Sequence, residues 1–337
     1  MLLRPRHLNV KGAVTPLIQA AVSKAAVQPA RRVRRKNLAA GLLFTSPVLI
    51  GYAVFIVIPL VMTFFLSFTD YSIGGPMSFV GWTNYEDMFT GKDIFFYPAV
   101  KATIYYVGVS VPLIIGFSFA MAILLNQNIR ARGFFRGVFY LPVVIPMASA
   151  GIIWMWMLQP DFGIVNHLLR EAGLPTSPWL ASDTTVIPTL ILFALWNCGS
   201  TIVIFLAGLQ SIPAHLYEAV EIDGGSAWHK LVHITIPMSS PIIFFNTVIG
   251  FINAFQTFVQ PAVMTSGSSG SGAASMGGPD NASLMYVLYL FQNAFRFSKM
   301  GAASANSVLL FLVTLGFTLV IFRFSRSLVH YEGDGTK

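Results

Sequence analysis

Long apolar stretches dominate this chain from residue 38 onward, and charged residues are confined to the segments between them. Each stretch is long enough for an α-helix that crosses a bilayer, which takes about 20 residues. The stretches lie at roughly 38–68, 102–126, 137–158, 186–210, 239–264 and 300–323. The pattern therefore predicts an all-α polytopic membrane protein with six transmembrane helices.

The composition supports this prediction and narrows the chemistry. The chain is 55% hydrophobic and 10% charged, whereas soluble domains are about 25% charged. Its single cysteine, Cys198, excludes an internal disulfide and is interpreted as a buried small residue. The histidines are scattered without metal-ligand spacing, and Asp93 follows Gly91-Lys92 where a phosphate loop needs Ser or Thr. We therefore expect no metal site, no nucleotide site and no enzymatic activity.

Charge along the chain predicts its orientation. Nine of the 21 basic residues lie in the first 36 positions, and the first acidic residue is Asp70. Residues 70–98 are mainly acidic, whereas residues 127–136 carry only basic charge. Because basic loops stay on the cytoplasmic side, both termini are expected there. We predict a basic cytoplasmic tail, 1–36, next to anionic membrane lipid, and a transmembrane domain, 37–330. The net charge of +8 is therefore not the signature of a nucleic-acid partner.

Residues 213–237 form the longest polar segment between apolar stretches whose charges have helical spacing. Pro213 precedes an amphipathic stretch that ends at Asp223, and Gly224 can adopt the left-handed conformation that ends a helix. Ser226 is a suitable N-cap for a second helix, which Pro237 closes. The segment thus predicts a helix–turn–helix on the cytoplasmic side, and its structural alternative is an ordinary connector.

This segment resembles the EAA loop of bacterial ABC importer permeases. The resemblance is carried by Glu218-Ala219, Asp223-Gly224 and residues 234–237, with Val220 and Ile236 as mild departures. Further matches to the carbohydrate importers of the maltose and glycerol-3-phosphate permease type extend from about residue 40 to 333. They lie at 66–68, 79–85, 134–136, 141–142, 154–156, 162–166, 206–213, 301–305 and 331–333.

The resemblance implies the type I permease fold of ABC importers, in a bacterial inner membrane. It implies a permease subunit that translocates a sugar or sugar-like solute delivered by an external binding protein. A second, homologous permease subunit and two ATPase subunits complete the assembly; the ATPases bind ATP and Mg, and this chain holds no cofactor. The implied ATPase-coupling residues are Glu218, Ala219, Asp223 and Gly224. The alternatives are an ATP-independent facilitator or channel for a small polar solute, and a membrane scaffold.

Polar and aromatic side chains on the fourth and fifth apolar stretches are candidates for solute contacts. Amides, hydroxyls and an aromatic face suit the hydroxyls and ring of a sugar, and the resemblance implies contacts on the spans that flank the EAA loop. An equally good interpretation is hydrogen bonding between packed helices. The candidate solute-binding residues are Trp196, Asn197, Ser200, Asn253, Gln256 and Thr257.

Residues 266–279 contain a Gly/Ser/Ala-rich insert at 268–276, where the family usually has a short Thr-x-Gly-Gly-Pro segment. This composition predicts a flexible, tolerated insertion in an external loop. Residues 283–296 have helical spacing of apolar side chains over too short a length to span. We expect them to form an interfacial helix on the outer face.

Overall fold

The computed structural model describes residues 30–128, 130–266 and 277–328. Most of the predicted tail, the insert at 268–276 and the motif at 331–333 lie outside the described residues. Within these ranges the elements are all helices, accompanied by two isolated β-bridges, Thr69 with Phe79 and Ser72 with Lys299. The all-α prediction is confirmed.

The chain divides into two units, Met1–Met62 and Thr63–Lys337. The described part of the first contains α2 (Ala30–Tyr52), the π-helix η1 (Ala53–Val57) and the start of α3 (Ile58–Leu66). The tail boundary after Lys36 stays a prediction; helix α2 begins within the predicted tail, at Ala30, and the candidate span begins at Ala40. Residues 30–36 contain no Gly or Pro, so nothing in their backbone opposes helix formation.

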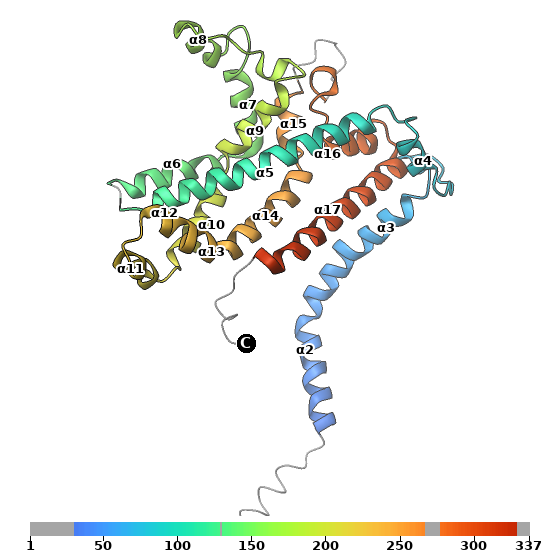
Figure 1. Ribbon diagram of the computed structural model, residues 1–337. Helices are drawn as coiled ribbons and strands as arrows, with labels where there is room; N and C mark the ends of the chain where they lie inside the picture. The colour runs from blue at the N-terminus through green and yellow to red at the C-terminus, as the bar shows by residue number, and fades with distance from the viewer. Residues whose placement is uncertain (1–29, 129, 267–276, 329–337) are drawn as a thin grey trace, which may run out of the picture. The chain divides into compact units, whose positions relative to one another are not determined.

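The second unit is built around α5 (Phe96–Asn126), which packs on α9 (Val186–Trp196), α10 (Gly199–Gln210) and α14 (Ser240–Phe255) (Figure 1). Small residues such as Ala99 and Ala102 are buried on α5 and allow neighbouring helices to approach closely. The last long helix is α17 (Met300–Leu328), which packs on α14.

The remaining helices are shorter and connect or flank these spans. The α-helices are α4 (Thr83–Phe89), α6 (Arg132–Val144), α7 (Met147–Met157), α8 (Ile164–Glu171), α11 (Ala214–Ile222), α12 (Ala227–Lys230), α13 (Ile236–Met238), α15 (Val259–Met264) and α16 (Tyr286–Phe291). The 3-10 and π-helices are η2 (Trp179–Ala181), η3 (Leu231–Thr235), η4 (Pro279–Asn281) and η5 (Gln292–Arg296).

The predicted spans differ in continuity. Three helices among the described residues are continuous candidate spans: Ala40–Leu66, Phe96–Asn126 and Met300–Phe324. Three further candidate spans are bent helix pairs, with angles of 98° between α6 and α7, 46° between α9 and α10, and 62° between Ala227–Met238 and α14. Six spans result when each bent pair counts as one. The apolar stretch at 239–264 is itself divided, because α14 ends at Phe255.

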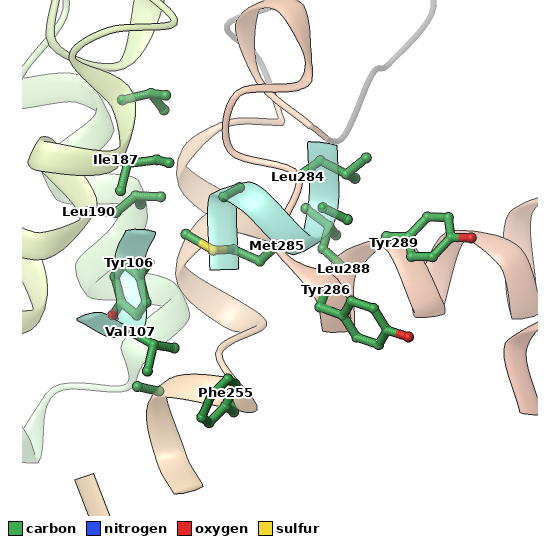
Figure 2. Packing of buried hydrophobic residues seen from close by; sticks show 14 of the residues in the cluster. Tyr106, Val107, Ile187, Leu190, Phe255, Leu284, Met285, Tyr286, Leu288 and Tyr289 are labelled. Carbon is green, nitrogen blue, oxygen red and sulfur yellow. The ribbon is translucent and has the colours of Figure 1, made fainter. Parts of the chain in front are cut away.

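The segment at 286–296 is helical as expected, but most of it is buried and only its end, at Phe295 and Arg296, is exposed. Met285 and Leu288 belong to the largest apolar cluster, together with Tyr106 and Val107 of α5 and Leu190 of α9 (Figure 2). Hydrogen bonds secure it as well: the amide of Tyr286 donates to Oγ1 of Thr103 at 2.8 Å, and its hydroxyl donates to Oδ1 of Asn306 at 3.1 Å. The sequence prediction failed here because it counted length alone and not the partners that cover the helix.

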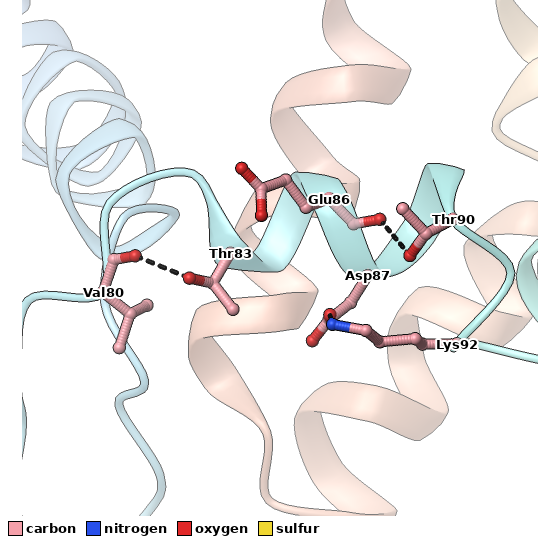
Figure 3. Close-up of polar contacts among 6 residues, drawn as sticks. All are labelled: Val80, Thr83, Glu86, Asp87, Thr90 and Lys92. Atoms are coloured by element: carbon pink, nitrogen blue, oxygen red, sulfur yellow. Dashed lines mark hydrogen bonds and ion pairs between the residues drawn. The ribbon is translucent and has the colours of Figure 1, made fainter.

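The predicted external loop at 70–98 is ordered by its own polar groups. Around α4, Oγ1 of Thr83 donates to the carbonyl of Val80 at 2.8 Å, and Lys92 pairs with Asp87 at 2.8 Å (Figure 3). The Asp70 carboxylate accepts hydrogen bonds from the backbone and hydroxyl of Ser78, and these bonds lower the pKa of Asp70. The loop that connects the first span to the second therefore has a defined shape.

Candidate functional site

A cavity of about 670 Å³ lies within the second unit, between α5, α10 and α14. Aliphatic side chains form most of its wall, including Val111 and Ile115 of α5 and Ile249 of α14. The cavity lining also contains polar side chains. The amides are those of Asn197, Asn246, Asn253 and Gln260, and the hydroxyls are those of Tyr106, Ser110, Ser200, Thr201 and Thr257. An apolar cavity with a few oriented polar groups is the usual form of a small-molecule site.

The bent spans supply Asn197, Ser200, Thr201, Asn246 and Asn253, which are most of these polar groups. The chain leaves helical geometry at Asn197 and Cys198 between α9 and α10, so two residues at the bend face the cavity. Gly250 on α14 keeps the opposite wall close, because a Cβ there would lie 3.3 Å from Cγ1 of Val111.

One polar group in the wall has unused hydrogen-bonding capacity. Ser110 is fully buried within α5, and its hydroxyl has no hydrogen-bond partner among the described residues. A buried hydroxyl without a partner is costly.

The structure brings together four of the six solute-contact candidates: Asn197, Ser200, Asn253 and Thr257 all line the cavity. Trp196 instead contacts the rings of Trp154 and Phe193, with centroid distances of 5.6 and 5.8 Å. Gln256 is exposed and lies outside the cavity lining, although its neighbour Thr257 is part of that lining.

Sequence reasoning missed Tyr106 and Ser110 because it considered only the spans that flank the polar segment, and it also missed Asn246 and Gln260 on the fifth stretch. Tyr106 and Ser110 come from the second span, and Gln260 comes from α15. A signal existed for Ser110, which is a polar residue inside an otherwise apolar stretch shortly before Pro112. No comparable pattern marked Gln260, which packing alone brings to the cavity.

The second candidate site is the polar segment at 213–237, which has the predicted helix–turn–helix form. Helix α11 is followed by Gly224 at a φ of +75°, and Oγ of Ser226 accepts from the backbone amide of His229 at 3.4 Å. Gly225 is constrained by space instead, since a Cβ there would lie 2.4 Å from Cγ1 of Val220. Both glycines are therefore required by the turn.

Polar contacts fix the two helices relative to each other. Lys230 pairs with Glu221, and the hydroxyl of Tyr217 lies 3.2 Å from Oγ1 of Thr235. By contrast, Glu218 and Asp223 are exposed, and neither carboxylate has a hydrogen-bond or ion-pair partner in the part of the chain that the structure describes. The motif acids are thus available to a partner, and the internal bracing is done by Glu221, which sequence reasoning did not single out.

Two large apolar side chains lie exposed on this polar segment. Ile222 is 86% exposed at the end of α11, and Trp228 is 69% exposed on α12. Exposed side chains of this size, next to a turn held by hydrogen bonds, are typical of a protein-binding surface.

Together, the bent spans, the polar cavity between them and the rigid polar segment define a multi-pass membrane transport protein. The chain belongs to the family of binding-protein-dependent transport system inner membrane components, which matches residues 112–330. It is therefore a permease subunit of an ABC transporter, and ATP hydrolysis belongs to a separate subunit.

Similar proteins cover nearly the whole chain. The probable ABC transporter permease protein YesP of Bacillus subtilis is 38% identical over 309 residues, 91% of this chain and 96% of the relative. The arabinooligosaccharides transport system permease protein AraP of the same organism is 30% identical over 300 residues, 88% and 91% respectively. The trehalose/maltose transport system permease protein MalF of Thermococcus litoralis is 28% identical over 297 residues, 88% and 96% respectively.

A solved structure has the same fold. A chain from the crystal structure of a bacterial ABC transporter that imports the acidic polysaccharide alginate superposes with a TM-score of 0.75 at 20% identity, covering 89% of this chain and 99% of that chain. The type I importer fold is confirmed. The comparisons support the importer and not the facilitator alternative.

Proposed function

We propose that this permease carries a sugar or a short oligosaccharide across the bacterial inner membrane. Several similar proteins are named for such solutes, among them arabinooligosaccharides, trehalose and maltose, and sulfoquinovosyl glycerol. The observation that carries the proposal is the cavity of about 670 Å³, in which four amides and five hydroxyls face an apolar wall. Sugars present hydroxyls and apolar ring faces together, so this lining suits them.

Within this cavity, we assign the solute contacts to Asn197, Ser200, Asn253 and Thr257, with Tyr106 and Ser110 added from α5. Asn197 and Asn253 have the greatest capacity among them, because an amide has two N–H donors and an acceptor oxygen. The lining contains no charged residue. A neutral solute therefore fits better than an anionic one.

The proposed energy source acts at the polar segment. Two ATPase subunits, which bind ATP and Mg, each grip one such segment, here through Glu218, Ala219, Asp223 and Gly224. Ile222 and Trp228 supply the apolar part of the contact. The bracing by Tyr217 and Glu221 makes the segment rigid, so that movement of the ATPases is passed to α10 and α14, which flank it.

The proposed assembly contains this chain, a second and homologous permease, two ATPases and an external solute-binding protein. One solved structure of similar fold is an alginate transporter in complex with a periplasmic protein bound to alginate pentasaccharide. Both termini face the cytoplasm in this arrangement, which also places the basic loop at 127–136 on that side.

Reconstituted uptake tests the proposal. The full assembly in vesicles, given a panel of labelled sugars with the binding protein, should take up one sugar class only when ATP is supplied. Glu218→Lys should reduce uptake by about tenfold or more, because it reverses an exposed charge at the ATPase contact. Glu86→Lys is the matched control, since Glu86 is an exposed acid on α4.

Two results would contradict the proposal. Solute flux through vesicles that contain this chain alone would indicate a facilitator. Uptake that is equally sensitive to Glu86→Lys and Glu218→Lys would remove the special role of the polar segment.

A further inference from the structure

Two arginines at the start of α6 meet one amide at the end of α10. With the Gln210 side chain oriented so that its oxygen faces them, it accepts from Nη2 of Arg136 at 2.9 Å and from Nη2 of Arg132 at 3.3 Å. Arg132 also donates from Nε to the carbonyl of Leu125 at 2.8 Å, and from Nη2 to Oδ1 of Asn126 at 3.3 Å. Two guanidinium groups therefore share neutral acceptors at the ends of α5 and α10.

The positive charge of this cluster is not balanced by a carboxylate. None of the ion pairs formed between described residues includes Arg132 or Arg136. The carboxyl ends of α5 and α10 contribute about half a negative charge each, which is less than the two arginines carry. In addition, Nε of Arg136 is buried and has no hydrogen-bond partner in the described part of the chain. Buried donors of this kind ordinarily have an acceptor.

The amino end of α6 also favours binding of an anion. Its N-cap is Ala131, which has a φ of 62° and no side chain that can accept from the free backbone amides. Basic residues in the first turn of a helix oppose its dipole. A negatively charged group at this position would therefore satisfy the arginines and the helix end together.

A narrow groove of about 230 Å³ leads away from Arg136 between α6 and α10. Apart from Arg136 and Gln210 at one end, its lining is apolar or aromatic: Leu125, Phe139, Tyr140, Gly199, Ile202, Val203, Leu206 and Ala207. A cationic head above an apolar groove in a membrane protein matches a phosphate joined to an acyl chain.

We propose that this groove between α6 and α10 binds an anionic phospholipid, with part of an acyl chain against Tyr140 and Val203. Its phosphate would lie at Arg136, which is in the groove lining, and at Arg132, which shares Gln210 with Arg136 just beyond the groove. A zwitterionic lipid is disfavoured, since its ammonium group finds no carboxylate in the groove lining. The proposal depends on the membrane location of the family and not on the proposed solute.

Binding here has a consequence for the neighbouring segment. Gln210 is the last residue of α10, and α11 begins at Ala214. An anion that lowers the repulsion between Arg132 and Arg136 would also hold the end of α10 in place. Anionic lipid is therefore expected to stabilise the complex as well as to bind it.

The test uses the purified complex in detergent, to which phosphatidylglycerol, phosphatidylcholine or inorganic phosphate is added. Lipid retained on the complex is measured by native mass spectrometry, and the thermal unfolding midpoint is measured in parallel. The native chain should retain phosphatidylglycerol about tenfold better than phosphatidylcholine, as expected for charge-assisted hydrogen bonds. The paired variant Arg132→Gln with Arg136→Gln should lose that preference.

Two further variants separate binding from folding and from net charge. Arg130→Gln with Arg170→Gln removes the same charge from exposed positions and should keep the preference. Ala207→Phe fills the groove while both arginines remain, and it should also lose phosphatidylglycerol. This variant covers the case in which the arginine pair is needed for folding.

Three outcomes would overturn the proposal. The first is equal retention of phosphatidylglycerol by the native chain and by both groove variants. The second is complete competition by inorganic phosphate, which would indicate a free-anion site. The third is loss of the ATPase subunits from the arginine variant with lipid retention unchanged, which would assign the arginines to a protein interface.

Discussion

At the scale of single residues, Gly224 is held at a φ of +75°, and a Cβ there would meet no atom within 4 Å. Substitution therefore costs backbone strain, on the order of 1 kcal/mol, without a steric clash. We expect Gly224→Ala to reduce ATP-driven uptake several-fold while membrane insertion stays normal, because the turn between α11 and α12 shifts. Uptake by reconstituted vesicles and the amount of inserted protein are the measurements.

Gly91 provides a control of matched geometry. It has a φ of +77°, its Cβ position is equally open, and it lies in the loop after α4. Gly91→Ala carries the same strain outside the polar segment and should leave uptake nearly unchanged. Equal losses in the two variants would show that strain in general, and not the turn at Gly224, limits transport.

Substitutions at Asn253 and Gln256 can distinguish solute contacts inside the cavity from contacts outside it. Both are exposed amides near the end of α14, but only Asn253 lines the cavity. Asn253→Ala should raise the solute concentration for half-maximal uptake by about tenfold, since it removes hydrogen bonds to the solute. Gln256→Ala should change it less than twofold. A larger effect of Gln256→Ala than of Asn253→Ala would show that the solute contacts lie outside the cavity.

Local chemistry explains which residues could be predicted from the sequence. The roles of Gly224 and Ser226 in the turn depend on backbone geometry within a few residues, so the sequence was sufficient for them. Ser110 and Gln260 reach the cavity only through packing of distant helices. The pair between Glu221 and Lys230 also crosses the turn, and no short-range spacing rule marks it.

At the scale of elements, the number of candidate spans could be predicted from the lengths of the apolar stretches, but the bends within the spans could not. The stretch at 137–158 is apolar throughout, yet it bends by 98° just before Met147, where Pro146 caps α7. The bend at Asn197 has a tertiary cause as well, since Gly199 lies so close to α6 that a Cβ would be 2.2 Å from the carbonyl oxygen of Phe139. Hydropathy reports burial in lipid and is insensitive to such contacts.

The exposed tryptophan on α12 leads to a prediction about binding of the ATPase subunit. Trp228 is 69% exposed, and a tryptophan in the centre of a protein contact commonly contributes 2 kcal/mol or more, roughly a 30-fold change in affinity. Trp228→Ala should therefore weaken co-purification of the ATPase subunit. Phe162→Ala is the control, because Phe162 is 74% exposed between α7 and α8. Unchanged ATPase retention in Trp228→Ala would place the contact elsewhere.

At the scale of the whole molecule, no Asp, Glu, Lys, Arg or His lies in the central part of the six apolar stretches. Ion-coupled carriers usually need such groups at membrane depth. Helices α10 and α14 instead connect the solute cavity to the polar segment. Both helices line the cavity, and they flank the polar segment in the chain. Transport by this chain is therefore expected to depend on changing the angles between bent spans.

Cys198 can report that change directly. It is the only cysteine in the chain, it is buried, and it lies on the cavity wall at the bend between α9 and α10. A small thiol reagent should modify it at a rate that differs between ATP-bound and ATP-free complexes, and the transported sugar should slow modification at least several-fold. In a Cys198→Ser background, Asn253→Cys should be protected at a sugar concentration about tenfold higher, because it lacks the Asn253 amide, and Gln256→Cys should not be protected. Mass spectrometry of the labelled chain measures all three, and protection of Gln256→Cys alone would refute the cavity as the solute path.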